Sequence, residues 1–284
     1  MIWRHARGEL DCTRGHVIGI VNATPDSFTD EGAHWGSERA TAHGLRLAAQ
    51  GASIVEVGGE SLRFSTETPV EEEIARVEPV IRALAAQLRV PVAIDTYKAP
   101  VAEAALRAGA VIVNDPTGLR DPAMAKVVAR AGAGVVVTHF FGEPKVRPTS
   151  FPEVDVPATV ISWAHASIEL AIAEGIDRDC VVIDPGIGLG KSPPQDLALL
   201  HRLHELQTLG RPIFVPISNK KVIGAVTGST AKQRLAGTTA AMAICRLNGA
   251  TIFRVHNVKF LVKALAMADA IVAGKPANWY EVVK

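Results

Sequence analysis

The sequence has few cysteines and almost no net charge. Its 284 residues include only Cys12, Cys180 and Cys245, which are far apart and odd in number. That spacing predicts neither a disulfide framework nor a zinc knuckle, so we expect reduced thiols in a cytoplasmic protein, with Cys180 and Cys245 as small core residues. The formal net charge is +1, and no basic run is present. Both facts argue against a broad nucleic-acid surface.

Long apolar segments are also missing. No apolar run reaches the roughly 18 residues that a membrane span requires. The first ten residues contain Arg4, His5, Arg7 and Glu9 and no apolar stretch, so no signal peptide is predicted. We therefore expect neither a membrane nor a nucleic acid as a partner. The hydrophobic fraction of 48% and the charged fraction of 21% are ordinary for a globular chain with a sizeable core.

Short β-branched runs alternate with helical stretches from end to end. The runs are nearly all apolar, as expected for parallel strands buried on both faces. We predict strands over His16–Asn22, Ser53–Val57, Val90–Thr96, Ala110–Asp115, Gly134–His139, Cys180–Asp184, Pro212–Ser218 and Ala250–Asn257. Between them, periodic stretches predict helices that include Val70–Leu88, Val101–Ala108, Pro122–Ala131, Val156–Glu174, Gln195–Leu209 and Thr230–Leu247. Several of these end in Gly, the usual residue for the left-handed position after a helix: Gly109, Gly132, Gly175, Gly210 and Gly249.

Eight strands, each followed by a helix, predict a (β/α)8 TIM barrel. A doubly wound open sheet is the competing architecture, but it would normally carry a Gly-rich phosphate fingerprint after its first strand, and none is present there. No linker or change of composition divides the chain. We therefore predict a single domain over residues 1–284, with residues 1–15 as an N-terminal extension.

Almost every predicted strand finishes in a polar residue. In a TIM barrel the C-terminal strand ends carry the chemistry. An Asp or Asn after any one strand is better explained as a turn or helix cap, but eight polar ends on one rim are harder to dismiss. The polar strand ends are Asn22, Glu56 followed by Glu60, Asp95, Asn114 with Asp115, His139, Asp184, the run Ser218-Asn219-Lys220-Lys221, and Arg254 with His256.

The mixture of polar groups suggests a site with two halves. Asp95, Asn114 and Asp184 suit a flat heterocycle rich in N–H donors and ring nitrogens. Arg254, His256 and Lys220 suit an anion or an oxygen that gains negative charge. Arg254 and His256 are separated by one residue, so on a strand both side chains face the same side.

Two loops after the first strands are longer than a simple connection requires. They are Thr24–Trp35, and Ser61–Pro69 with Arg63 and Phe64. Long polar loops on this rim often act as lids, although parts of both are equally well explained as plain surface loops. The segment from Asp184 to Lys191 is rich in glycine but lacks the P-loop spacing. We interpret its glycines as permitting close backbone approach beside Asp184.

These residues together resemble the dihydropteroate synthase family, from about His16 to the end of the chain. The resemblance rests on the motifs VNATPDSF (21–28), VGGES (57–61), IDT (94–96), VND (113–115), IDPGIGLGK (183–191) and RVH (254–256). Corrinoid-linked methyltetrahydrofolate methyltransferase domains share the pterin-barrel fold but resemble this pattern less well.

The resemblance implies a transferase of folate synthesis. It would condense 6-hydroxymethyl-7,8-dihydropterin diphosphate with 4-aminobenzoate and release diphosphate. Carried over by motif, Asp95, Asn114, Asp184 and Lys220 bind the pterin. Asn22 ligates a Mg²⁺ ion, and Asn22, Arg254 and His256 bind the diphosphate. Asp95, Lys220 and Arg63 are the implied catalytic residues, and Phe64, Ser218, Asn219 and Lys221 the implied acceptor-binding ones.

The departures from the family pattern gather on the acceptor side. Where the family usually has Ser-Thr-Arg-Pro, this chain has Ser-Leu-Arg-Phe at 61–64, and Ser-Asn-Lys-Lys at 218–221 replaces the usual Ser-Arg-Lys-Ser. An Asp of the family pattern is replaced by Glu56. The pattern predicts a synthase with altered acceptor or sulfonamide preference. The alternatives are a pterin-binding paralogue that condenses aminobenzoate poorly and a non-catalytic pterin-binding protein.

The resemblance also implies a homodimer formed through helices of the C-terminal half. The stretch Thr238–Ile244 there is small and apolar, although a plain core helix explains it equally well.

Overall fold

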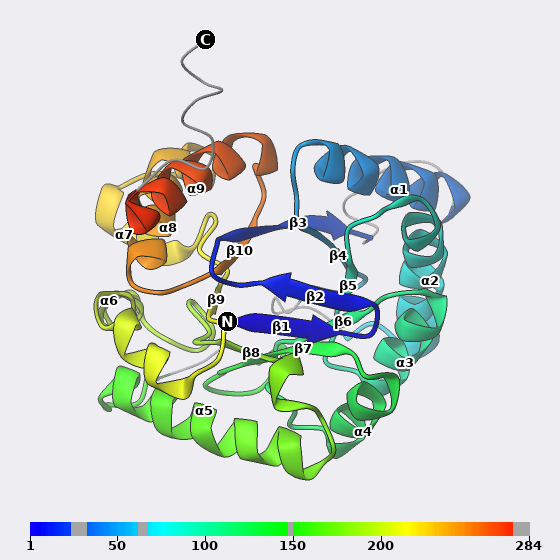
Figure 1. Cartoon of the computed structure of the whole chain (residues 1–284), viewed down its shortest axis with the longest axis horizontal. Coiled ribbons are helices and arrows are strands. Elements are labelled where there is room, and N and C mark those ends of the chain that lie inside the picture. Colours follow the sequence, from blue (N-terminus) through cyan, green and yellow to red (C-terminus); the bar gives the residue numbers. More distant parts are fainter. Residues whose placement is uncertain (24–32, 62–66, 147–149, 275–284) are drawn as a thin grey trace.

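The structure is a computed structural model that describes residues 1–23, 33–61, 67–146 and 150–274, with the backbone alone for residues 33–35. Parallel strands form a nearly closed barrel with helices around it (Figure 1). The barrel strands are β3 (His16–Asn22), β4 (Ile54–Gly58), β5 (Val92–Asp95), β6 (Ile112–Asp115), β7 (Gly134–Thr138), β8 (Val181–Asp184), β9 (Phe214–Val215) and β10 (Ile252–Val255). They are ordered β8-β7-β6-β5-β4-β3-β10-β9, and a bridge between Ile183 and Ile213 joins β8 to β9. The predicted TIM barrel is confirmed.

Helices follow the strands and form the outer layer. They are α1 (Ala33–Ala49), α2 (Val70–Gln87), α3 (Ala99–Ala108), α4 (Pro122–Ala131), α5 (Val156–Ala173), α6 (Pro193–His201), α7 (Lys221–Thr227), α8 (Leu235–Leu247) and α9 (Val258–Ala273). The described residues also contain the 3₁₀ turns η2 (Arg178–Cys180), η3 (Leu203–Leu209) and η4 (Ala231–Gln233). All five glycines predicted to close helices have φ between 58° and 116°, the left-handed region that glycine tolerates best.

Three predicted elements differ from the structure. The strand expected over Pro212–Ser218 pairs only at Phe214–Val215, because the prolines at 212 and 216 have no N–H to donate. The helix expected over Gln195–Leu209 is divided into α6 and η3. The helix expected over Thr230–Leu247 begins as the separate turn η4, where a capping box between Thr230 and Gln233 starts a short helix before α8.

The barrel interior is layered, and the layering positions the polar strand ends. One buried layer is apolar and consists of Ile18, Ile54, Ala93, Ile112, Val136, Val182, Phe214 and Ile252. Side chains two residues further along a strand face the same side. The next interior positions are therefore polar in six strands: Glu56, Asp95, Asn114, Thr138, Asp184 and Arg254.

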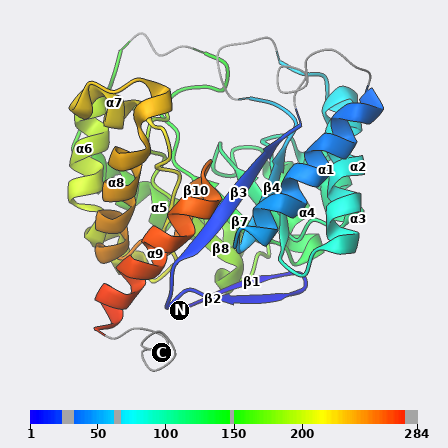
Figure 2. The ribbon, with the colours of Figure 1, turned by 90° about the horizontal axis from the view of Figure 1, so that it is seen from above.

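A hairpin made by β1 (Ile2–His5) and β2 (Gly8–Asp11) lies across the end of the barrel where the strands begin (Figure 2). Trp3 is fully buried, belongs to the interior apolar cluster, and donates its Nε1–H to the carbonyl oxygen of Cys180 at 2.9 Å. Gly134 allows this approach, because a Cβ at that position would lie 2.9 Å from Trp3 Nε1. The hairpin thus seals the end of the barrel opposite the polar layer.

One described helix, α5, is long and apolar enough by length and composition to cross a membrane. It packs against β8, α6 and η3 and buries Val160, Ala164 and Ile168, among others. Its apolar composition is therefore explained by its place in the outer layer of the barrel.

Candidate functional site

The polar layer lies at the C-terminal ends of the strands, away from the hairpin (Figure 2). Its centre is Arg254 on β10, which donates from Nε to Glu56 on β4 and from Nη2 to Asp95 Oδ2 on β5 at 2.5 Å. Asn114 on β6 donates its side-chain N–H to the second oxygen of Glu56 at 2.9 Å. Four strands therefore contribute to one hydrogen-bonded group, and three of its members were predicted site residues.

The charges in this group depend on one another. Burial raises the pKa of Glu56 to about 7, and the Arg254 guanidinium opposes the rise. Burial also raises the pKa of Asp95, against the attraction of Arg254 and Lys220. Burial disfavours the Arg254 cation, but the two carboxylates outweigh it and raise the pKa of Arg254, which stays charged. The Arg254 cation therefore lies between the carboxyl groups of Glu56 and Asp95. The side chains of Arg254 and Asp95 are partly exposed to solvent.

Asp184 ends β8 on the opposite side of the same layer. It accepts the backbone N–H of Gly186 at 2.7 Å and a long hydrogen bond of 3.5 Å from Thr138 Oγ1. Burial raises the pKa of Asp184 to about 6, while the Gly186 N–H and Lys220 favour the anion. A Cβ at Gly186 would lie 1.8 Å from the carbonyl oxygen of His139, so this glycine is required by close backbone approach, as predicted.

Lys220 immediately precedes α7 and lies close to the polar layer. Burial lowers its pKa, and the surrounding carboxylates of Asp184, Asp196 and Asp95 counteract the effect. Asp196 is buried in α6, accepts the N–H of Gly188 at 2.8 Å, and has a pKa raised by burial to about 6. The sequence did not reveal Asp196, because a single acid within a helix has no distinguishing pattern.

Lys191 has a structural role at the end of the Gly-rich segment. It is buried, and its ammonium donates to the carbonyl oxygens of Gly186 at 2.9 Å, His139 at 3.2 Å and Leu189 at 3.4 Å. All three acceptors belong to the backbone around Asp184. This lysine therefore fixes the loop, in agreement with the absence of P-loop spacing.

The surroundings of His139 are less polar than its position at a strand end suggested. Its ring packs edge-on against Phe141 and Trp163, with centroids 4.5 and 4.9 Å away. Burial lowers its pKa to about 3, so it is neutral. Its Nδ1 has no hydrogen-bond partner among the residues that the structure describes.

Three of the four predicted acceptor residues, Ser218, Asn219 and Lys221, lie at the turn after β9. Ser218 Oγ is 2.9 Å from His256 Nδ1, which joins the ends of the last two strands of the barrel. Asn219 has a left-handed φ of 59°, and its carbonyl oxygen accepts from Arg234 at 2.9 Å. Lys221 is exposed at the first position of α7. Their roles toward an acceptor remain predictions.

Asn22, the predicted metal ligand, is exposed at the end of β3. Among the described residues, no three His, Cys, Asp or Glu side chains are grouped so that they could hold a metal ion. An amide oxygen is nevertheless a suitable ligand for Mg²⁺, which usually retains several waters and binds substrate phosphates. The donor set therefore fits an ion shared with a bound diphosphate and does not fit a site built from protein ligands alone.

Arg63 and Phe64 lie outside the described residues, but both ends of their loop are held by a buried group that the sequence did not reveal. Lys98 donates to Glu60 at 2.8 Å, to Glu73 at 2.9 Å and to the carbonyl oxygen of Thr68 at 2.5 Å. Glu60 also accepts the Thr68 N–H at 2.6 Å. We call Lys98, Glu60, Glu73 and Thr68 the loop anchor.

A further lysine ties this loop to its neighbour across the rim. Lys145, which follows β7, lies 2.9 Å from Glu60 and donates to the carbonyl oxygen of Ser61. Burial raises the pKa of Glu60, but hydrogen bonds from Lys98, Thr68 and Lys145 outweigh it and lower the pKa to about 2. The carboxylate is therefore firmly ionised.

Comparisons with known proteins show which family this chain resembles. The family model described as pterin binding enzyme matches residues 18–256. Dihydropteroate synthase of Escherichia coli K12 is 36% identical over 273 residues, which cover 96% of this chain and 97% of the relative. A solved structure of the Xanthomonas albilineans dihydropteroate synthase in complex with 7,8-dihydropteroate is 40% identical, covers 96% of this chain and 99% of that one, and superimposes with a TM-score of 0.86.

One relative gives a contrasting result. The inactive dihydropteroate synthase 2 of Mycobacterium leprae is 38% identical over 269 residues, which cover 92% of this chain and 91% of the relative. A relative called inactive is thus as similar as the Escherichia coli synthase. Overall identity does not separate the two, and the site residues have to be judged individually.

Proposed function

Because the chain belongs to the pterin-binding enzyme family, with dihydropteroate synthases as full-length relatives, we propose that it joins a dihydropterin diphosphate to 4-aminobenzoate and releases diphosphate. The observation that carries the proposal is the polar layer. It offers carboxylate and amide groups on one side, at Asp184 and Asn114, and a guanidinium on the other, at Arg254.

The ring end of the substrate belongs at Asp184 and Asn114. A pterin presents an amino group and ring N–H groups along one edge, and carboxylate oxygens accept such donors. One oxygen of Asp184 is already held by the Gly186 N–H, so the carboxylate is oriented before the ligand arrives. Lys220, flanked by Asp184 and Asp196, is placed to donate to the ring oxygen or nitrogen atoms.

The diphosphate end belongs at Asn22, Arg254 and His256. Arg254 remains cationic beside its two carboxylates, and His256 is exposed just beyond the end of the same strand, β10. Asn22 would help to hold a Mg²⁺ ion, which would supply positive charge to stabilise the departing diphosphate. Arg254 supplies the same kind of stabilisation from a fixed position.

The reaction exchanges one bond for another at the exocyclic carbon of the pterin. The bond from this carbon to the diphosphate oxygen breaks, and that oxygen takes the electron pair. The amine nitrogen of aminobenzoate forms the new bond to carbon and then loses a proton. Asp95, held by Arg254 at 2.5 Å, lies where a carboxylate stabilises positive charge developing on the ring. No protein nucleophile is required.

The acceptor belongs at the turn after β9 and the loop that carries Arg63 and Phe64. Lys221 is exposed at the start of α7, where an ammonium group can pair with the carboxylate of aminobenzoate. Ser218 and Asn219 form the adjoining turn. The loop anchor fixes both ends of the other loop, at Glu60 and Thr68.

A pterin-binding protein without condensation activity is the second candidate. The inactive relative of Mycobacterium leprae favours it, as do the altered residues on the acceptor side. This candidate predicts affinity for the pterin without Mg²⁺-dependent release of diphosphate. The retained Arg254 and His256 favour the enzyme, because a protein that binds only the ring has no need of an anion site.

One assay decides between the two. Purified protein is incubated with the dihydropterin diphosphate, Mg²⁺ and 4-aminobenzoate, while diphosphate and dihydropteroate are both measured. Equal amounts of the two products establish the synthase. Pterin binding without either product supports the second candidate, and diphosphate without dihydropteroate shows hydrolysis and contradicts the proposed acceptor. A reaction with EDTA tests the requirement for Mg²⁺.

We also propose that two copies associate through the face formed by α8 and α9, which pack against each other. Large apolar side chains on these helices are exposed, among them Ile244, Leu247, Met267 and Ile271, each more than half exposed. Such a face is a good candidate for an interface between copies. Light scattering should give a dimer mass, and Met267→Glu together with Ile271→Glu should give a monomer.

We further propose that residues 1–284 form one domain, which includes the N-terminal extension 1–15. We also propose that the enzyme is cytoplasmic. The buried position of Trp3 within the barrel supports the first statement. Three buried cysteines without a disulfide among the described residues are consistent with the second.

A further inference from the structure

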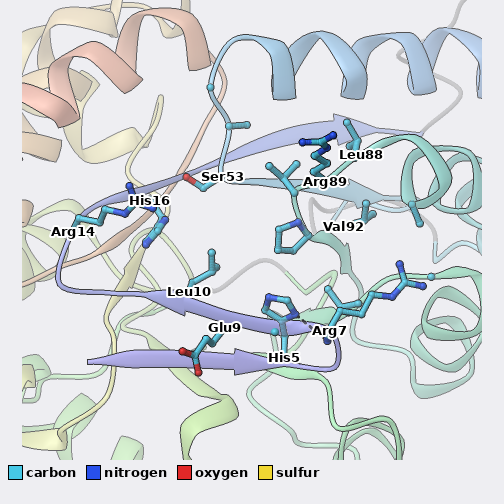
Figure 3. A pocket seen from close by; sticks show the side chains of 18 residues that line it. His5, Arg7, Glu9, Leu10, Arg14, His16, Ser53, Leu88, Arg89 and Val92 are labelled. Carbon is cyan, nitrogen blue, oxygen red and sulfur yellow. Dashed lines mark hydrogen bonds between the residues drawn. The ribbon is translucent and has the colours of Figure 1, made fainter.

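A cavity of about 540 Å³ lies at the end of the barrel opposite the proposed active site (Figure 3). The hairpin β1–β2 forms one wall. The segment 51–53 before β4 and the segment 88–92 before β5 form others. Small-molecule sites in proteins typically measure about 300–1,000 Å³, so the cavity has room for an organic ligand and not only for an inorganic ion.

Three arginines from different segments line this cavity. Arg7 comes from the turn of the hairpin, Arg14 from the segment before β3, and Arg89 from the segment before β5. Figure 3 shows Arg14 in one half of the view and Arg7 with Arg89 in the other. Within the described parts of the chain, no carboxylate lies within 4.0 Å of any of these three guanidinium groups. Positively charged side chains therefore lie on different sides of the cavity.

Two acidic residues of the hairpin lie near the arginines. Asp11, at the end of β2, attracts Arg14 without an ion pair within 4.0 Å. The acidic residue of the lining is Glu9, and it lies 4.0 Å from Arg4, a residue outside the lining. In a chain with a net charge of only +1, three guanidinium groups that form no ion pair with a described residue thus line one cavity. The guanidinium group of arginine can donate two parallel hydrogen bonds to the oxygens of a phosphate or a carboxylate.

Two neutral histidines add to the polar part of the lining. Burial lowers the pKa of both His5 and His16. His16 Nε2 is 2.8 Å from the carbonyl oxygen of Asp11, so this nitrogen carries the proton. His5 Nδ1 accepts from the Arg7 N–H at 3.3 Å, which leaves its Nε2–H as a further donor.

Most of the remaining lining side chains are apolar, apart from the hydroxyl group of Ser53. Leu10 comes from the hairpin, and Leu88, Val90, Pro91 and Val92 come from the barrel side. These side chains are buried or partly buried, whereas the three arginines are exposed. An apolar floor with cationic groups around it suits a ligand with an apolar or aromatic body and an anionic group.

We propose that this cavity, which we call the hairpin cavity, binds a small organic phosphate, with Arg7, Arg14 and Arg89 on the phosphate groups and the apolar floor under the organic body. The proposed reaction does not use this end of the barrel. The ligand is therefore a second one, bound independently of the pterin and the acceptor.

ATP in the absence of Mg²⁺ serves as the probe, with adenosine and inorganic tripolyphosphate as its two halves. Binding to the purified full-length protein is measured by isothermal titration calorimetry. We expect ATP to bind, adenosine to show no binding, and tripolyphosphate to bind at least about 10-fold more weakly than ATP, because it lacks a body to cover the apolar floor. Tripolyphosphate binding as tightly as ATP would overturn the claim of an organic ligand.

The variant Arg7→Gln with Arg89→Gln locates the site. Each lost guanidinium should weaken ATP binding by at least about 10-fold. The matched control is Arg46→Gln, because Arg46 is an exposed arginine in the last turn of α1 that forms a hydrogen bond with His43 and lies outside the lining. Arg7 and Arg89 have no carboxylate partner, so the unfolding temperature and the synthase activity should stay unchanged.

Two results would place the ligand elsewhere and refute the proposal. One is equal ATP affinity in the wild type and in the double variant. The other is loss of ATP binding in Arg254→Gln, or displacement of ATP by the dihydropterin diphosphate, since both would put ATP in the proposed active site. Retained binding in Arg254→Gln and Arg46→Gln, with loss in the double variant, supports the hairpin cavity.

Discussion

Replacing Lys98 by Met should destabilise the protein strongly and loosen the acceptor loop. Lys98 is 7% exposed and donates to two buried carboxylates, at 2.8 Å to Glu60 and at 2.9 Å to Glu73. Removing one partner of a buried ion pair leaves an uncompensated charge and costs about 3–5 kcal/mol. With an unfolding entropy of about 2.1 cal/mol/K per residue over 284 residues, this corresponds to a drop of about 5–8 °C in Tm.

The pH dependence of this effect tests its cause. Without the ammonium group, burial should raise the folded-state pKa of Glu73 further above its unfolded value, so its ionised form destabilises the fold as pH rises. Glu60 keeps its hydrogen bonds from Thr68 and Lys145 and should contribute less to this change. The Tm difference between Lys98→Met and wild type should therefore be largest near pH 7 and narrow toward pH 4. The control Lys126→Met changes an exposed lysine on α4 and should shift Tm by less than about 1 °C. Calorimetry at three pH values gives these numbers.

The activity of the same variant tests the link to the acceptor. Because the loop anchor holds both ends of the loop with Arg63 and Phe64, the KM for 4-aminobenzoate should rise more than the KM for the pterin substrate. A Tm within 2 °C of wild type at pH 7, or a Tm difference that does not change with pH, would refute the assigned role of the anchor.

Further predictions concern three other positions. Asp184→Asn keeps the shape of the side chain but replaces an acceptor by a donor, and kcat/KM should fall roughly 10- to 100-fold; steady-state rates near wild type would contradict the pterin role. Gly186→Ala should abolish pterin binding in a fluorescence titration, because its Cβ would meet the carbonyl oxygen of His139, whereas Gly132→Ala, also left-handed but with nothing within 4 Å, should cost only about 1 kcal/mol. In wild type, the carboxylate of Glu60 stabilises the fold above its unfolded pKa of about 4.5, and this contribution is lost as pH falls toward its folded pKa of about 2. The stability difference between wild type and Glu60→Gln in urea unfolding should therefore be full at pH 6 and smaller at pH 3.5, and a constant difference would show that ionisation is not its source.

The barrel and its polar rim were predictable from the sequence because both depend on local periodicity. A strand alternates its two faces at every residue, so an apolar run ending in a polar residue fixes which side chain enters the interior. Asp95, Asn114, Asp184 and Arg254 were found in this way and do lie in one layer. The strand predicted over Pro212–Ser218 was too long, because the prolines on both sides of β9 cannot donate backbone hydrogen bonds.

The partners of these residues were decided by the tertiary structure alone. Arg254 and Glu56 are 198 residues apart, and Trp3 and Cys180 are 177 apart. No periodic pattern relates positions at such separations. The same applies to Asp196 beside Lys220 and to the loop anchor, whose members come from the loop after β4, from α2 and from the start of α3.

The sequence by itself determined the fold class and the end of the barrel that carries the polar groups, because side-chain direction along a strand is a local property. Only the closed barrel decided which charges neutralise one another, which lysine is structural, and that the N-terminal hairpin covers a cationic cavity at the other end. Those outcomes depend on distances in space and on burial, which raises or lowers each pKa, and neither is encoded within a short stretch of chain.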